Sequence, residues 1–200
     1  MEIEGFILAG GASSRMGEDK SRLSLDGRTF VESAAKALRV ITPKVCIVSS
    51  RPRAESHGLP VIKDLRAGLG ALGGLHAALS TCRAEWAVVV ACDLPFVTGE
   101  LLARLDSMRA DTLDAIVPTQ EDGRAQPLCA LYRVSVCVEQ VEELIRTDEL
   151  RPRLLLWRVR ARRVEFGELR DLAGSARFFL NVNTPEDYAR ALDEGGAGCA

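Results

Sequence analysis

Residues 3–20 read IEGFILAGGASSRMGEDK, a short apolar run followed by a glycine-rich segment that carries two basic residues. The apolar run, residues 3–9, is typical of a strand that is buried on both faces of a sheet. Adjacent glycines let the backbone approach a ligand and turn its N–H groups inward, while Arg15 and Lys20 supply positive charge. This stretch therefore predicts a strand followed by a loop that holds a polyphosphate.

The alternation of strand and helix patterns continues through the first half of the chain. Residues 45–48 and 86–91 are similar apolar runs, and apolar residues at helical spacing occur within residues 29–40, 72–79 and 101–108. Such alternation implies parallel strands joined by right-handed crossovers, with helices on both faces of the sheet. Ligands of these folds bind beyond the carboxyl ends of the strands, so we expect the chemistry in the loops that follow strands.

The second half is less regular. It predicts strands at residues 115–117, 128–132 and 163–166, a helix at 135–145 and a last helix from Pro185. Residues 151–163 are rich in arginine around an apolar LLLW run, which predicts a surface helix whose apolar side packs, with phosphate binding as the alternative. We expect one three-layer α/β/α domain over residues 1–194, with a mostly parallel twisted sheet, and a flexible tail at 195–200.

Composition excludes several classes of protein. The 200 residues are 47% hydrophobic and 27% charged, and 26 Lys and Arg against 28 Asp and Glu give a net charge of -2. No overall field would draw such a chain to nucleic acid or to an anionic membrane. The start lacks a basic signal region, and no apolar run reaches the roughly 20 residues of a spanning helix. We expect a soluble cytoplasmic protein with neither a membrane nor a nucleic-acid partner.

The cysteines and histidines predict no site of their own. The six cysteines have no zinc-type spacing, so we expect neither a metal site nor a disulfide framework, and Cys46 and Cys92 read as small core hydrophobes. Only two histidines occur, without a Ser or Cys in a nucleophile setting, which disfavours a His-based triad.

Two common nucleotide motifs do not fit the first loop. A Walker A loop needs G-x-x-x-x-G-K-[S/T], whereas five residues separate Gly11 from Gly17 and Lys20 comes three residues later. A dinucleotide fingerprint needs G-x-G-x-x-G and an acid after the second strand, where this chain has Ser49 and Ser50. A hydride-transfer enzyme is therefore disfavoured.

The glycine-rich stretch, residues 8–20, resembles the signature loop of the molybdenum cofactor guanylyltransferases, the MobA-like nucleotidyltransferases. Four later segments agree with that family in its own order: Asp64 with Gly70–Gly74, Cys92–Phe96, Gln126–Leu128 with Leu131 and Tyr132, and Asn181–Asp187. The resemblance runs from residue 3 to about residue 190, and it implies a Rossmann-like nucleotidyltransferase fold.

The resemblance also implies a reaction, transfer of GMP from GTP to the terminal phosphate of molybdopterin, with or without its molybdenum, and release of pyrophosphate. Two anions must meet, so catalysis has to rest on charge neutralisation and positioning, with Mg²⁺ as the natural clamp. Asp93 ends an apolar strand and would hold the metal, and the family comparison adds Asn183 and, less directly, Asn181. Lys20 would balance charge on the α- and β-phosphates, and Arg15 would hold the leaving pyrophosphate.

GTP contacts follow from the same resemblance. They are Leu8, Ala9, Gly10, Gly11, Lys20, Ser49, Asp64, Gly70, Gly74 and Asp93. Relatives that use CTP read alanine where this chain has Gly10, and Asp64 could accept hydrogen bonds from a guanine edge or a ribose hydroxyl. Two departures bear on base choice, because Ser49 stands where many relatives have asparagine and Ala71 replaces the usual proline.

Other interpretations remain open at this point. The nearer alternative is a cytidylyltransferase, or another nucleotidyltransferase of the same fold with a different acceptor. The more distant one is a non-catalytic nucleotide- or RNA-binding protein that uses residues 151–163. Asp93 could merely cap the next helix, although Thr98 suits that role better. Transient contacts with proteins that deliver molybdopterin or mature molybdoenzymes are also expected.

Overall fold

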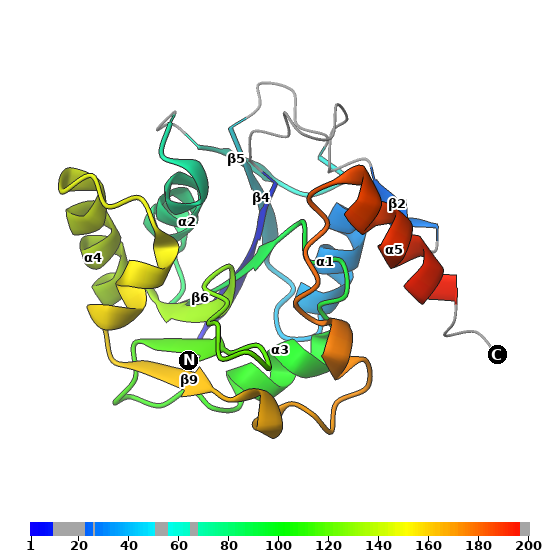
Figure 1. The fold of residues 1–200 in the computed structure, drawn as a ribbon. Coiled ribbons are helices and arrows are strands. Elements are labelled where there is room, and N and C mark those ends of the chain that lie inside the picture. The colour runs from blue at the N-terminus through cyan, green and yellow to red at the C-terminus, as the bar shows by residue number, and fades with distance from the viewer. Residues whose placement is uncertain (10–22, 26, 51–55, 65–67, 197–200) are drawn as a thin grey trace.

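The computed structural model describes residues 1–9, 23–25, 27–50, 56–64 and 68–196, and it contains a seven-stranded sheet between layers of helices (Figure 1). The strand order is β5-β4-β1-β6-β8-β7-β9. These strands are β1 (Ile3–Leu8), β4 (Val45–Ser49), β5 (Val61–Lys63), β6 (Trp86–Ala91), β7 (Ala115–Pro118), β8 (Cys129–Arg133) and β9 (Ala161–Val164). Strands β5, β4, β1 and β6 are parallel, and β8 lies antiparallel between β6 and β7. The predicted mostly parallel sheet is confirmed.

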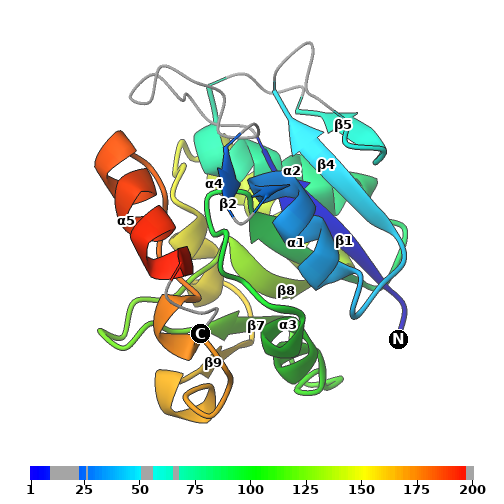
Figure 2. The same cartoon turned by 90° about the vertical axis from the view of Figure 1, so that its right-hand side faces the viewer.

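Helices cover both faces of the sheet. Figure 1 shows α2 (Gly70–Thr81) and α4 (Val134–Arg146) on one side, and α1 (Phe30–Leu38) and α3 (Gly99–Asp106) on the other. Figure 2 shows α5 (Pro185–Gly196) outside the α1 layer, beside the hairpin of β2 (Ser24–Leu25) and β3 (Arg28–Thr29). The described residues also form three short 3₁₀ helices: η2 (Pro152–Trp157), η3 (Phe166–Glu168) and η4 (Ser175–Arg177).

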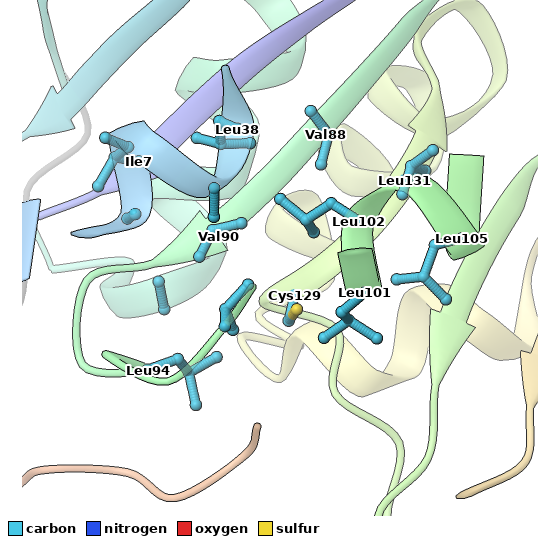
Figure 3. Close-up of a cluster of buried hydrophobic side chains, with 14 of the residues drawn as sticks. Ile7, Leu38, Val88, Val90, Leu94, Leu101, Leu102, Leu105, Cys129 and Leu131 are labelled. Carbon is cyan, nitrogen blue, oxygen red and sulfur yellow. The ribbon is translucent and has the colours of Figure 1, made fainter. Parts of the chain in front are cut away.

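The core explains why the strands read as continuous apolar runs. On β6, Val88 and Val90 face the α1 and α3 side, where they share a cluster with Leu38 and Leu101 (Figure 3). The intervening Val89 belongs to the cluster on the opposite face, beneath α2 and α4. Because a central strand such as β6 is buried on both faces, all of its consecutive side chains are apolar. The strand predictions at 45–48, 86–91 and 115–117 are confirmed within a residue or so.

A third, smaller cluster joins α5 to the hairpin. It contains the buried side chains of Leu23, Leu25, Phe30, Val182 and Ala191. The Tyr188 hydroxyl also donates a hydrogen bond of 2.7 Å to the Ser24 carbonyl oxygen. This packing fixes the segment before α5 against the hairpin.

The helix predicted for residues 151–163 is wrong. The segment forms η2, with Leu155 and Leu156 buried, and then β9, which pairs with β7. Arg160 is held to the sheet because its main-chain N–H and its guanidinium both donate to the carboxylate of Asp114. Long-range bonding of this kind overrides a local helical pattern. The strand predicted at 163–166 accordingly lies earlier, at Ala161–Val164, and Phe166 begins η3.

Thr98, not Asp93, caps α3, since its side chain accepts from the main-chain N–H of Leu101 at 3.3 Å. The five described cysteines are free, namely Cys46, Cys82, Cys92, Cys129 and Cys137. Helix α5 includes Gly195 and Gly196 of the predicted tail, and residues 197–200 lie outside the described part. Within the described residues, no helix has the length and apolar character needed to cross a membrane.

Candidate active site

Main-chain hydrogen bonds join the segments that follow the parallel strands. They run from Cys92 N to Leu8 O (3.1 Å), from Ala9 N to Val48 O (2.9 Å) and from Asp64 N to Ser49 O (3.0 Å). The predicted site residues at the ends of β1, β4, β5 and β6 are thereby brought to one end of the sheet. We refer to it as the carboxyl end.

Asp93 lies at the centre of this end, directly after β6, and is half-buried. Its carbonyl oxygen accepts a hydrogen bond of 3.0 Å from the N–H of Val182, a residue from the far end of the chain. Val182 is buried in the cluster beneath α5, while Asn181 and Asn183 on either side of it are exposed. One main-chain bond therefore brings both predicted asparagines next to Asp93.

The two asparagines differ in what they border. Asn181 lines the same cavity as Asp93, whereas Asn183 is not among the residues around it. The main-chain N–H of Asn183 donates to the Asp187 carboxylate at 3.1 Å, as does that of Thr184. The main-chain hydrogen bond from Asn183 lowers the pKa of Asp187 most, and the Arg190 guanidinium and the bond from Thr184 lower it further. Asp187 therefore stabilises the turn that presents Asn183.

The predicted nucleotide contacts gather on the half of the sheet formed by β1, β4 and β5. Ser49 is buried at the end of β4, and Asp64 is half-buried just after β5. At the start of α2, Gly70 has a φ of +55°, which an L side chain rarely adopts. Gly74, one turn later, packs against Leu8, and a Cβ there would lie 3.6 Å from a methyl carbon of Leu8. The two glycines thus let α2 begin close to the end of β1.

Four predicted residues lie outside the described part of the chain: Gly10, Gly11, Arg15 and Lys20. Their roles stay predictions.

A cavity of about 400 Å³ opens beside Asp93, on the half of the sheet that carries β8. Its polar wall is made by Asp93, Gln126, Arg151, Arg153 and Asn181. Its apolar wall includes Leu94, Pro127, Leu128, Leu150 and Pro152. The family resemblance includes Gln126–Leu128, whereas the sequence assigns neither Leu150 nor Arg153 to a site. The only signal for them was the run of arginines, for which phosphate binding was the alternative.

The donor atoms around Asp93 suit a hard cation. Carboxylate and amide oxygens are the ligands that Mg²⁺ prefers, and Asp93 and Asn181 bring one of each to the same cavity. Among the residues that the structure describes, no group of three or more His, Cys, Asp and Glu side chains could hold a metal ion.

Comparison with known proteins decides the family. The sequence model of the MobA-like NTP transferase domain matches residues 5–163, more than half of the chain. This chain belongs to the MobA-like NTP transferase family. Its membership confirms the resemblance found in the glycine-rich loop and makes it a nucleotidyltransferase.

Individual members of the MobA-like family match nearly the whole chain. A protein of Pelotomaculum thermopropionicum named "Probable molybdenum cofactor guanylyltransferase" is 35% identical over 96% of this chain and 92% of its own length. The molybdenum cofactor guanylyltransferase of Yersinia pestis is 35% identical, with 92% of each chain covered. The crystal structure of molybdopterin-guanine dinucleotide biosynthesis protein A from Archaeoglobus fulgidus has a TM-score of 0.78 and 28% identity, and covers 97% of this chain and 99% of its own.

Proposed function

We propose that this chain is a molybdenum cofactor guanylyltransferase, which transfers GMP from GTP to the terminal phosphate of molybdopterin and releases pyrophosphate. Relatives with that name match it over nearly their full length. The observation that carries the proposal is the meeting of Ser49, Asp64, Asp93 and Asn181 at one end of the sheet, since these residues lie far apart in the sequence. That end is where parallel folds bind their ligands.

The roles of the residues follow from the chemistry. An oxygen of the acceptor phosphate attacks the α-phosphorus of GTP, and the bond from that phosphorus to the bridging oxygen breaks as pyrophosphate leaves. No covalent intermediate with the protein is needed, so the residues act by holding and neutralising the reacting phosphates. Lys20 and Arg15 supply positive charge to the nucleotide, with the main chain at Gly10 and Gly11 completing the cradle.

The family indicates a divalent metal, and we propose that it is Mg²⁺. Asp93 would hold it, with an amide oxygen from Asn181 or Asn183, since hard oxygen donors fit this ion. The bound ion would neutralise charge that develops on the phosphates. The protein's part is to fix Asp93 at the end of β6 and to keep the asparagines beside it through the bond between Asp93 and Val182.

Guanine recognition is proposed for the half of the sheet that carries Ser49 and Asp64. A carboxylate can accept two hydrogen bonds from the N–H groups of guanine, whereas cytosine offers a different edge. The end of β1, with Leu8 and Ala9, and the start of α2, with Gly70 and Gly74, lie close to the same place. We further propose that the protein acts in the cytoplasm and exchanges molybdopterin with proteins that deliver it or use it.

A panel of nucleotides tests this function. The purified protein is incubated with molybdopterin, Mg²⁺ and each of GTP, CTP, ATP and UTP, and pyrophosphate and the pterin dinucleotide are measured. We expect product with GTP, little with the others, and a much lower rate for Lys20→Ala. Preference for CTP would favour the cytidylyltransferase alternative. Salt-dependent polynucleotide binding without pyrophosphate release would favour a non-catalytic protein.

A further inference from the structure

A second cavity, of about 460 Å³, lies where α1 and α3 meet on one face of the sheet. Figure 2 shows these two helices on that face. The walls come from three parts of the chain: the hairpin with α1, the loop between β6 and α3, and the segment that contains η4. None of the predicted site residues in the described part of the chain borders this cavity. The proposed transfer reaction therefore does not account for it.

The second cavity is positively charged. Arg28 and Lys36 line it from the hairpin and from α1, and Arg177 lines it from η4. Among the described residues around it, Glu100 has the only carboxylate. The chain as a whole carries a net charge of -2, so this excess of cations is local. A local positive field of this kind favours an anionic ligand.

The Glu100 carboxylate is already engaged at the start of α3. Hydrogen bonds from its own main-chain N–H and from the Thr98 side chain lower its pKa, and the charge of Lys36 lowers it further. Neither Arg28 nor Lys36 forms an ion pair with another residue in the described part of the chain. Both cations therefore remain available to an anion that enters the cavity. Charge-assisted contacts to phosphate are among the stronger hydrogen bonds in proteins.

The remaining lining of this cavity is largely apolar and includes an aromatic ring. Val40, just after α1, is 62% exposed there, and Phe96 and Pro95 line the wall after β6. The Arg177 guanidinium lies 5.2 Å from the centre of the Phe96 ring, which joins two of the three walls. An inorganic ion would leave the apolar surface in water, whereas an organic molecule would cover it. The volume is also within the usual range of small-molecule sites.

The walls of the second cavity are formed by rigid elements. Thr29, next to Arg28, and Glu32 exchange hydrogen bonds that fix the start of α1. The buried Gly99 lets α3 begin close to the end of α1, since a Cβ at Gly99 would overlap the Val40 side chain. A ligand therefore has little chain to order when it binds, which lowers the entropic cost of binding.

We propose that this second cavity binds an organic phosphate, whose phosphate group is held by Arg28 and Lys36. The apolar part of the ligand lies against Val40 and Phe96. A phosphate ester with a hydrophobic or aromatic body combines the negative charge and the apolar surface that the lining requires.

The second cavity borders the supports of the proposed reaction site without including its residues. Pro95 lies just after Asp93 in the chain, and Arg177 lies just before Asn181. The hairpin follows the glycine-rich stretch directly. A bound organic phosphate would thus contact a neighbour of each part of that site. The binding itself does not depend on the proposed function.

Protection of a thiol from modification locates the ligand. Val40→Cys places a thiol in the cavity, and Arg39→Cys places one at the adjacent exposed position outside it. Each variant is treated with iodoacetamide, and modification of that peptide is followed by mass spectrometry with and without naphthyl phosphate. We expect this aromatic phosphate to slow modification of Val40→Cys about fivefold or more and to leave Arg39→Cys unchanged, as mass action at one local site requires. No protection of Val40→Cys, or equal protection of both variants, would overturn the proposal.

Two further probes test the chemistry of the ligand. Naphthol, which lacks the phosphate, and inorganic phosphate, which lacks the ring, should each protect Val40→Cys much less than naphthyl phosphate does. Equal protection by naphthol would rule out an anion site. Equal protection by inorganic phosphate would reduce the cavity to a site for a simple ion and overturn the organic assignment.

Charge removal tests the two cations. In the Val40→Cys background, Arg28→Ala and Lys36→Ala should each weaken binding of naphthyl phosphate about tenfold, as expected for loss of a charge-assisted contact. Arg39→Ala is the matched control, because Arg39 is an exposed cation that does not line the cavity. Full protection in the combined Arg28→Ala and Lys36→Ala variant would overturn the proposal. A parent protein that transfers no GMP but shows the predicted protection pattern would lose the proposed function and keep this site.

Discussion

At the amino end of the sheet, charged side chains bond to one another, whereas at the carboxyl end they border a cavity. At the amino end, the Arg160 guanidinium donates to the buried Asp114 carboxylate at 2.7 and 2.8 Å. The guanidinium groups of Arg133 and Arg109 lie over the ring of the buried Trp86, at 5.0 and 5.8 Å from its centre. At the carboxyl end, Arg153 lines the same cavity as Asp93.

The difference separates residues that stabilise the fold from residues that we propose to serve the reaction. Polar groups at the amino end satisfy each other within the chain, so their loss leaves buried groups unpaired and lowers stability. Groups at the carboxyl end lie where a ligand can reach them, so their loss should lower activity with little change in stability. Substitutions at the two ends should therefore have opposite profiles.

The largest effect is expected from Asp93→Ala. Removal of the proposed metal ligand deletes charge stabilisation without opening a core cavity, so the transfer rate should fall at least about a hundredfold. The midpoint of thermal unfolding should stay close to that of the parent. Rates are measured with Mg²⁺ titrated to saturation, and Asp111→Ala serves as the control, since Asp111 is exposed at the amino end. Substantial turnover by folded Asp93→Ala would refute the assignment.

The reverse profile is expected from Asp114→Ala. This carboxylate accepts three hydrogen bonds from Arg160, and its loss should lower the free energy of unfolding by about 2 kcal/mol. Values of kcat/KM well below the melting temperature should match those of the parent. Urea unfolding and steady-state kinetics on the same preparation check both halves of this prediction. A large loss of kcat/KM without destabilisation would contradict the contrast between the two ends of the sheet.

The same carboxylate predicts how stability depends on pH. Hydrogen bonds from Arg160 lower the pKa of Asp114 in the folded protein from its ordinary value of 3.8. A lowered folded pKa means that the stabilisation is fully present well above pH 3.8 and is lost as the pH falls through the folded pKa. The gap in unfolding free energy between the parent and Asp114→Asn should therefore be constant near neutral pH and shrink below pH 3.8. A gap that widened on acidification would contradict the bonding described.

A smaller effect is expected from Tyr188→Phe, since this residue supports the carboxyl end without lining the cavity. Its hydroxyl bonds to Ser24, and its ring packs edge-on against Phe30 with centroids 6.2 Å apart. Loss of the hydroxyl should cost about 1 kcal/mol of stability, as for an ordinary hydrogen bond. We also expect the apparent affinity for Mg²⁺ to fall a few-fold, since α5 follows the asparagine segment. Unchanged stability together with unchanged Mg²⁺ titration would show that this contact has no such role.

The sequence predicted best those elements whose pattern is set by their own burial. The strand at 86–91 lies between two layers of helices, so every residue in it is apolar and the prediction was right. The proposed role of Asp93 follows from its position after that strand and from the family resemblance. The three-residue β5 was not predicted, since only Ile62 at its centre is partly buried.

The cavity beside Asp93 escaped prediction for a different reason. The position of η2 and β9 depends on the bonding of Arg160 to Asp114, which lies 46 residues earlier in the chain. Residues 151–163 alone do not show that Arg160 bonds to Asp114, so the apolar LLLW run in this segment predicts one continuous surface helix. The cavity wall formed by Arg151 and Arg153 could therefore be found only in the folded protein.

The central claim is that the nucleotide binds on the half of the carboxyl end that carries Ser49 and Asp64, with its α-phosphate next to Asp93. A crystal structure with Mg²⁺ and a GTP analogue that cannot be cleaved at the α-phosphorus tests it most directly. We expect guanine beside Ser49 and Asp64, the α-phosphate next to Asp93, and the cavity between Gln126 and Arg153 left open. Guanine bound in that cavity, against Leu150 and Arg153, would contradict the account.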